Sequence, residues 1–171
     1  MRQHSIVVID ADASPSGYIA WYNHHTEKGT IRPVRPSPKN ERFGVQRMEL
    51  LAIYFALRDN LAHIRRALRR SSKRRIVVEV RSDSKTTVDQ LRGTTQIRDS
   101  LMRRIVSVIG RLLAGMDCCT TIVFDHLERS KNIAGLMLEQ RRRKEQERMM
   151  EMLSSSYDMP GFAPPVSSLC A

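Results

Sequence analysis

The sequence of 171 residues lacks several features that would assign it to particular classes of protein. Its three cysteines are Cys118, Cys119 and Cys170, and adjacent cysteines neither bond each other readily nor form a spaced zinc knuckle. We therefore expect ordinary thiols in a reducing compartment. No apolar run approaches the ~20 residues that span a bilayer, and the N-terminus leads into a short strand-like run instead of a signal peptide. A soluble, cytoplasmic protein without a membrane partner is expected.

Aromatic residues are also few, at 5% of the chain. Trp21 is the single tryptophan, and both it and Tyr54 lie in otherwise apolar segments, so we expect them in the core and not stacked on nucleic acid. The sequence has no internal repeat. A chain of this length is predicted to form one domain, over residues 1–152, and the serine- and proline-containing segment 153–171 is predicted to be a disordered tail.

Positive charge is in excess, because 29 Lys and Arg residues face 18 Asp and Glu residues and give a formal charge of +11. Such charge attracts polyanions, and nucleic acid is the partner that it favours. A basic surface can also keep a protein soluble or bind acidic lipid or an acidic protein. The densest cluster contains the candidate phosphate contacts Arg69, Arg70, Lys73 and Arg74. Arginines at the end of a helix also suit its dipole, so this cluster has two interpretations.

Hydropathy patterning alternates short β-like runs with amphipathic helices. We expect strands at 5–9, 18–22, 30–34, 76–81 and 120–124, and helices at 45–68, 85–91, 97–113 and from 131 or 132 onward. Residues 10–17 contain proline and glycine and are predicted to form the turn of a β-hairpin. This order predicts an α/β fold with a mixed five-stranded sheet: an antiparallel hairpin, an edge strand and two parallel strands, flanked by helices. The last helix becomes basic and is expected to project at its distal end.

Three acidic residues stand where this arrangement would bring them together. Asp10 ends the first apolar run, Asp83 follows the fourth predicted strand, and Glu49 lies on an apolar helix face. Parallel strands that end on the same side bring their last residues to one crevice. A buried carboxylate needs a partner, and clustered oxygen ligands favour magnesium or manganese over zinc. We therefore predict a site for these cations, while Asp12 is expected to bond its own backbone in the turn and at most to support the ligands.

Four segments resemble type 1 ribonuclease H, over roughly residues 5–138. They are Ile6-Val7-Val8-Ile9-Asp10 with the hairpin after it, Met48-Glu49-Leu50-Leu51-Ala52, Arg81-Ser82-Asp83-Ser84, and the histidine loop His126-Leu127-Glu128-Arg129-Ser130-Lys131-Asn132. The resemblance implies a ribonuclease H-like fold and an endonuclease that cuts the RNA strand of RNA–DNA hybrids. It also implies two Mg²⁺ or Mn²⁺ ions held by Asp10, Glu49 and Asp83, with His126 in proton transfer or product release. Lys85 and Asn132 complete the expected nucleic-acid contacts.

The chain departs from this family at one position. Enzymes of this kind carry a fourth carboxylate four residues after the asparagine, and Leu136 stands there instead. Glu128 and Glu139 are the candidates to replace it. Losing one ligand weakens the second metal more than the first, so activity that is reduced, dependent on manganese or absent is consistent with the sequence.

Three functions follow from these observations. A metal-dependent endonuclease that cuts RNA–DNA hybrids is favoured, because the acidic trio and His126 are retained. The alternatives are a non-catalytic nucleic-acid-binding module and a DNA or junction nuclease of a related fold. The chain is expected to be a monomer.

Overall fold

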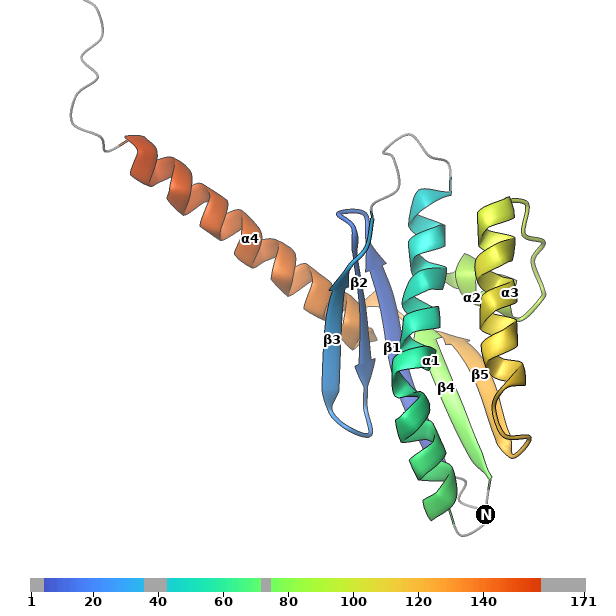
Figure 1. Cartoon of the computed structure of the whole chain (residues 1–171). Helices are drawn as coiled ribbons and strands as arrows, with labels where there is room; N and C mark the ends of the chain where they lie inside the picture. Colours follow the sequence, from blue (N-terminus) through green and yellow to red (C-terminus); the bar gives the residue numbers. More distant parts are fainter. Residues whose placement is uncertain (1–4, 36–42, 72–74, 158–171) are drawn as a thin grey trace, which may run out of the picture. The chain divides into compact units, whose positions relative to one another are not determined.

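Five strands form one mixed sheet in the order β3-β2-β1-β4-β5 (Figure 1). The structure, a computed structural model, describes residues 5–35, 43–71 and 75–157. The strands are β1 (Ser5–Ser14), β2 (Tyr18–Asn23), β3 (Lys28–Pro33), β4 (Ile76–Ser82) and β5 (Thr120–His126). β2 runs antiparallel to both of its neighbours, β1 and β3, whereas β1, β4 and β5 run parallel. The predicted five-stranded α/β sheet is therefore confirmed.

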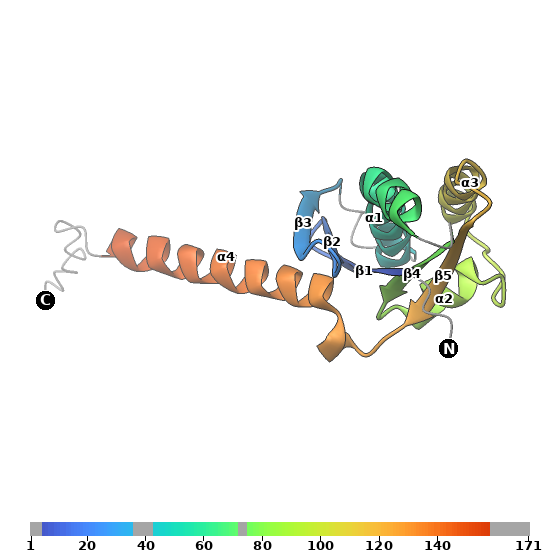
Figure 2. The ribbon, with the colours of Figure 1, turned by 90° about the horizontal axis from the view of Figure 1, so that it is seen from below.

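The helices of the described chain are α1 (Gly44–Arg70), α2 (Lys85–Leu91), α3 (Ser100–Ala114) and α4 (Ile133–Tyr157), with a short 3-10 turn, η1 (Arg129–Lys131). α1 and α3 lie side by side on one face of the sheet (Figure 2). None of the helices in the described ranges is long and apolar enough to cross a membrane.

The chain divides into two compact units, Met1–Glu139 and Gln140–Ala171, and the boundary between them falls within helix α4. Within the first unit, Ala134 and Leu138 of α4 pack with Ala20 of β2 in a small apolar cluster. The helix continues past residue 152 to Tyr157, so the first residues of the segment expected to be a tail are helical. The rest of that segment lies outside the described residues.

The hydrophobic core lies between the sheet and α1. Val7, Ile9 and Ala11 of β1 are fully buried and belong to one apolar cluster with Leu50 and Ile53 of α1. Because side chains alternate along a strand, the even-numbered residues of β1 belong to its other face. That alternation determines which face carries the acidic side chains of β1.

Strand β1 is longer than the sequence predicts. Residues 10–14 were expected to open a turn, but they pair with β2, in a register that runs from Asp10 opposite Tyr22 to Ser14 opposite Tyr18. The turn therefore begins only at Pro15, and Gly17 closes it with a positive φ of 88°. Aspartate is unfavourable in strands, and here pairing with a neighbouring strand outweighs that local preference.

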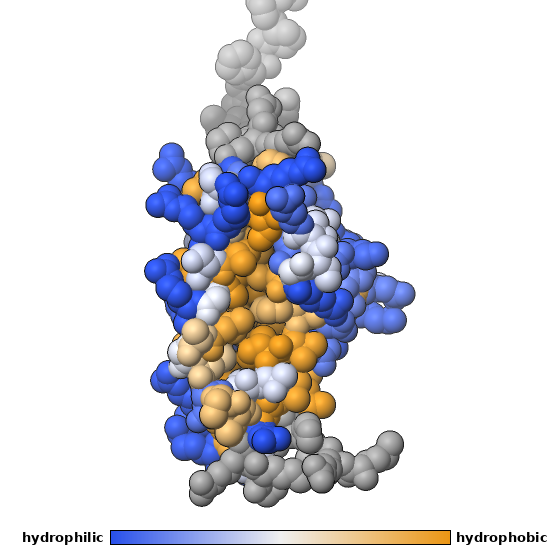
Figure 3. Space-filling model, turned by 90° about the vertical axis from the view of Figure 1, so that its right-hand side faces the viewer, coloured by the Kyte–Doolittle hydropathy of each residue, from blue (hydrophilic) through white to orange (hydrophobic). Residues whose placement is uncertain are grey.

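Helix α3 is held to the core by a narrow apolar stripe and by an ion pair at its start. Met102 and Ile109 are its buried residues. Asp99 accepts a hydrogen bond from the backbone N–H of Met102 at 2.8 Å and pairs with Arg47 of α1 at 2.6 Å. The Arg47 guanidinium lowers the pKa of Asp99 to about 2. On the outside, apolar side chains form a band bordered by charged ones on this side of the molecule (Figure 3).

Candidate metal centre

Three carboxylates converge where β4 ends. Asp12 of β1, Glu49 of α1 and Asp83, which directly follows β4, each offer an oxygen, and these oxygens all lie within 4.8 Å of one another. Asp12 and Glu49 are only 3% and 6% exposed, and the side chain of Asp83 is 11% exposed. Three acidic groups are thus gathered with little access to water.

The strand register explains this convergence. In the parallel pair β1–β4, Asp10 lies opposite Arg81, so Asp12 comes level with Asp83 two residues farther along each strand. Glu49 approaches from the N-terminal half of α1, and Ser82 Oγ donates a long hydrogen bond of 3.5 Å to Glu49 Oε2. Two strands and a helix therefore supply one ligand each.

The cluster is electrostatically unbalanced. Burial, followed by the negative charge of Asp83, raises the pKa of Asp12 to about 7. Burial, followed by the charges of Asp12 and Asp83, also raises the pKa of Glu49 well above its usual value. Three negative charges cannot share this space without a proton or a cation. The donor set, made only of carboxylate oxygens, fits a hard cation such as Mg²⁺ or Mn²⁺.

Asp10 does not belong to the cluster, and Asp12 takes the position predicted for it. Asp10 is fully buried. Its Oδ1 accepts a hydrogen bond from Arg81 Nε at 2.8 Å and forms an ion pair with Arg81 Nη2 at 2.7 Å. Its Oδ2 accepts one from the backbone N–H of Ile133 at 3.2 Å and lies 2.8 Å from His24 Nε2. Asp10 therefore ties β1 to β4, to the turn after β2 and to the first residue of α4. The expectation that Asp12 is a turn residue was wrong for the same reason, since β1 continues through it.

Asn132, the residue before α4, holds Asp83 in position by hydrogen bonding. It is fully buried, and its Nδ2 donates to Asp83 Oδ1 and to the backbone oxygen of Ala11, both at 3.2 Å. Its Oδ1 accepts a long hydrogen bond of 3.4 Å from the backbone N–H of Gly135. This residue was predicted to contact nucleic acid, but burial assigns it to holding Asp83 and the start of α4 instead.

His126 lies beside the cluster. It ends β5, is exposed, and its Nε2 lies 3.2 Å from the backbone oxygen of Asp83. Its parallel neighbour on β4 is Ser82, which explains why the two strand ends meet there. An exposed imidazole at this distance can exchange a proton with a molecule bound at the carboxylates.

No fourth carboxylate joins the three in the part of the chain that the structure describes. Glu128 is 71% exposed and pairs with Lys131 at 3.0 Å, and Glu139 is not one of the grouped acids either, so neither replaces the missing ligand. Leu136 is 46% exposed. Its neighbour Gly135 packs directly on the cluster, because a Cβ placed there would lie 2.8 Å from Asp12 Oδ2.

Arg129, which was not among the predicted site residues, also lies next to the cluster. Its Nη1 lies 3.7 Å from Asp83 Oδ2, and the side chain is 77% exposed. The only signal in the sequence was its place within the histidine loop, between His126 and Asn132. That Arg129 lies next to Asp83 becomes visible only when the loop is placed in three dimensions.

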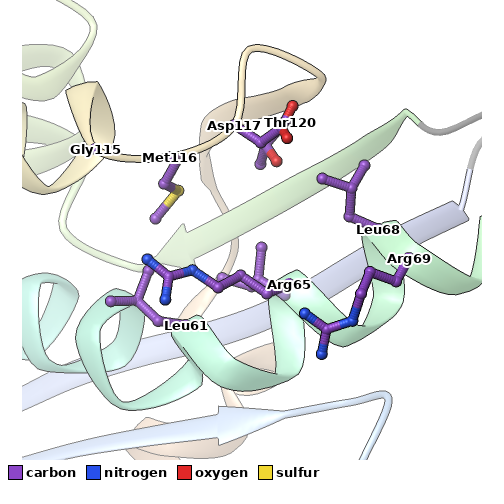
Figure 4. Close-up of a pocket in the computed structure, with 9 residues that line it drawn as sticks. Leu61, Arg65, Leu68, Arg69, Gly115, Met116, Asp117 and Thr120 are labelled. Atoms are coloured by element: carbon purple, nitrogen blue, oxygen red, sulfur yellow. The ribbon is translucent and has the colours of Figure 1, made fainter.

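The predicted phosphate contacts on α1 lie far from the carboxylates. Arg69 and Arg70 follow Glu49 by about twenty residues, which corresponds to about 30 Å along a helix. Arg69 and Arg65 instead border a cavity of about 400 Å³ whose other lining includes Leu68 and Met116 (Figure 4). Binding of nucleic acid by this end of α1 stays a prediction, and Lys73 and Arg74 lie outside the described residues. Lys85 is exposed at the start of α2, close in sequence to Asp83.

A second acidic group lies in the loop before β5. Asp117, Cys118 and Cys119 offer ligand atoms within 4.8 Å of one another. The two cysteines are free thiols, as expected, and hydrogen bonding to Asp117 raises the pKa of Cys119. A thiol that keeps its proton is a poor metal ligand, so the carboxylate cluster is the stronger candidate.

Comparison with known proteins gives matches among solved structures. No family model and no curated protein sequence matches the chain. The RNase H1 of the archaeon Halobacterium salinarum NRC-1 is similar, with a TM-score of 0.58, 19% identity and coverage of 76% of this chain and 91% of that one. LC11-RNase H1, solved in complex with an RNA/DNA hybrid, has a TM-score of 0.58, 17% identity and coverage of 74% and 88%.

A third similar structure is the N-terminal RNase H domain of a Mycobacterium tuberculosis protein. It has a TM-score of 0.54, 14% identity and coverage of 75% of this chain and 86% of that one. At such identities the likeness establishes the arrangement of the backbone and no more. Together with the order and direction of the five strands, these matches lead to one conclusion: the chain has the ribonuclease H-like fold.

Proposed function

We propose that this protein is a divalent-metal-dependent endonuclease that hydrolyses the RNA strand of RNA–DNA hybrids. One observation carries the proposal: Asp12, Glu49 and Asp83 bring carboxylate oxygens within 4.8 Å of one another at the end of a parallel strand. The raised pKa of Asp12, to about 7, and of Glu49 supports it, because both groups would be relieved by a cation.

Each residue of the site has a task in this proposal. The three carboxylates would hold the cation, and Asn132 keeps Asp83 in place through its hydrogen bond to Oδ1. A divalent cation bound there would supply the means to activate water and to stabilise the leaving oxygen of a phosphodiester. His126, exposed beside Asp83, gives or takes the proton at the leaving oxygen.

The hybrid substrate is proposed on charge and on the fold. A formal charge of +11 favours a polyanion, and LC11-RNase H1, which shares the fold, was solved with an RNA/DNA hybrid. A groove that contacts 2′-hydroxyls distinguishes a hybrid from duplex DNA. Competition between the two duplexes therefore tests the substrate class separately from the chemistry.

The decisive experiment incubates the purified protein with Mg²⁺ or Mn²⁺ and a hybrid labelled on each strand, beside duplex and branched DNA. We expect cleavage of the RNA strand alone. Asp12→Asn and Asp83→Asn should abolish it, while Glu128→Gln, which changes an exposed acid of the neighbouring loop, should leave it intact. Undiminished cleavage by Asp12→Asn would remove the assignment, and preferred cleavage of branched DNA would make the protein a DNA nuclease.

A non-catalytic nucleic-acid-binding module is the second candidate. The observation in its favour is that α4 brings no acid to the described cluster, where Leu136 and Gly135 stand in its first turn. This candidate predicts that the hybrid binds equally well in EDTA and in Mn²⁺ and is cut in neither. Cleavage that begins when Mn²⁺ replaces EDTA would exclude it.

A further inference from the structure

We propose that Arg129 supplies the positive charge on the Asp83 side of the acidic cluster, so that the cluster takes one divalent cation and not two. The inference deepens the proposed function, because it rests on the cluster being a cation site. It concerns the number of ions that bind and the positive group that takes the place of a second ion. Neither point follows from the fold.

The contacts of Asp83 single it out among the three carboxylates. Its Oδ1 accepts a hydrogen bond from Asn132 Nδ2 at 3.2 Å, and its Oδ2 faces Arg129 Nη1 at 3.7 Å. In the described ranges, no basic side chain forms an ion pair with Asp12 or Glu49. One side of the cluster is therefore neutralised by protein, and the other is left for a cation.

The remaining charges of the histidine loop do not compete for Arg129. Lys131 and Glu128 pair with each other at 3.0 Å on the same turn, which leaves the guanidinium of Arg129 to Asp83. With 77% of its side chain exposed, this arginine stays hydrated and can move to a substrate phosphate without the cost of exposing a buried charge. Its planar fork of N–H donors suits phosphate oxygens.

Charge counting favours a single ion. Three ionised carboxylates carry −3, and one dication together with Arg129 carries +3, so the centre is balanced. A second dication would leave an excess of +2 with Arg129 in place, and an excess of +1 if it displaced the arginine from Asp83. It would also need a ligand from α4, where Gly135 has no side chain and Leu136 is apolar. Arg129 is thus a positioning residue that acts through Asp83.

The test counts bound Mn²⁺ without nucleic acid, by measuring the electron paramagnetic resonance signal of the free ion during titration of the full chain. We expect one Mn²⁺ per wild-type chain and the same count and affinity for Arg129→Lys. Arg129→Gln should bind that ion about threefold more tightly, since the loss of an exposed ion pair is worth a factor of this order. The Arg129→Gln, Leu136→Asp double variant, which removes the arginine and adds a ligand, should bind two.

Lys131→Gln is the matched control, because it removes a positive charge from the same turn without touching Asp83, and it should leave count and affinity unchanged. Two ions on the wild-type chain, or equal affinity for Arg129→Gln and Arg129→Lys, would overturn the inference. A wild type that binds no Mn²⁺ would overturn the proposed metal site as well. One ion with the predicted arginine effect, but no hybrid cleavage, would keep this inference and reject the endonuclease.

Discussion

Asp12→Asn should stabilise the metal-free protein at alkaline pH. Asp12 is 3% exposed and lies within 4.8 Å of two further carboxylates. Burial and the charge of Asp83 raise its pKa from 3.8 to about 7. An asparagine has almost the same shape but no charge, so it removes the cost of ionising this group while keeping the fold.

The size and sign of the effect follow from linkage between ionisation and folding. Because the folded pKa of Asp12 lies above the unfolded one, the contribution of this group to stability is fully present below pH 4 and is lost as the pH rises through about 7. A shift of about three pKa units at 1.36 kcal/mol each corresponds to about 4 kcal/mol at pH 8. At pH 5, only about a third of that cost has accumulated, so the advantage of the variant falls below about 2 kcal/mol.

The assay is urea unfolding in EDTA at pH 5 and pH 8, with the wild type and both Asp→Asn variants of β1. Asp10→Asn is the control, two residues away on the same strand. It breaks the buried pair with Arg81, and we expect it to destabilise by about 3 kcal/mol. At pH 8, a free energy of unfolding that rises in Asp12→Asn and falls in Asp10→Asn would support the structure. An Asp12→Asn protein that is less stable than wild type at pH 8 would refute the reasoning.

Three further predictions concern the support of the cluster. Gly135→Ala places a Cβ 2.8 Å from Asp12 Oδ2, so calorimetry should record at least tenfold weaker Mn²⁺ binding, and unchanged binding would contradict the close contact. Asn132→Ala frees Asp83 Oδ1 and removes a buried amide, so Tm should fall by several degrees together with Mn²⁺ affinity, whereas a loss of neither would show that the bond is incidental. His126→Ala should lower the cleavage rate about a hundredfold with Mn²⁺ binding intact, and parallel losses of both would place it among the ligands.

Much of the fold could be predicted from local pattern. The helix at Lys85–Leu91 begins and ends where the sequence indicates, because a serine precedes it and a glycine follows shortly after it. The strand expected at 76–81 is β4, and its side chains alternate between buried and half-buried along the strand. These features depend on neighbours along the chain, which a sequence displays directly.

The choice between Asp10 and Asp12 could not be made in the same way. Both residues lie on one face of β1, so alternation does not distinguish them. What decides is the register: Ser5 lies opposite Ile76, and equal steps along both strands reach Asp12 and Asp83 together. Registers between strands distant in sequence are set by tertiary packing, and the turn-forming residues around Asp12 pointed to an earlier end of the strand.

The roles of Arg129 and Asn132 were also hidden. Arg129 lies on a three-residue turn, and Asn132 is buried against Ala11 on a strand far away in sequence. Sequence pattern identified the loop that carries them but not which side chain turns inward. Which side chain turns inward depends on burial and on contacts between residues more than a hundred positions apart. Neither can be recognised from neighbouring residues in the sequence.

The central claim is that Asp12, Glu49 and Asp83 hold a divalent cation, and anomalous diffraction from crystals grown with Mn²⁺ tests it most directly. We predict one strong anomalous peak in contact with oxygens of all three carboxylates, with Asp10 still bonded to Arg81. A peak bound by Asp10, or no peak among these carboxylates at saturating Mn²⁺, would contradict the account.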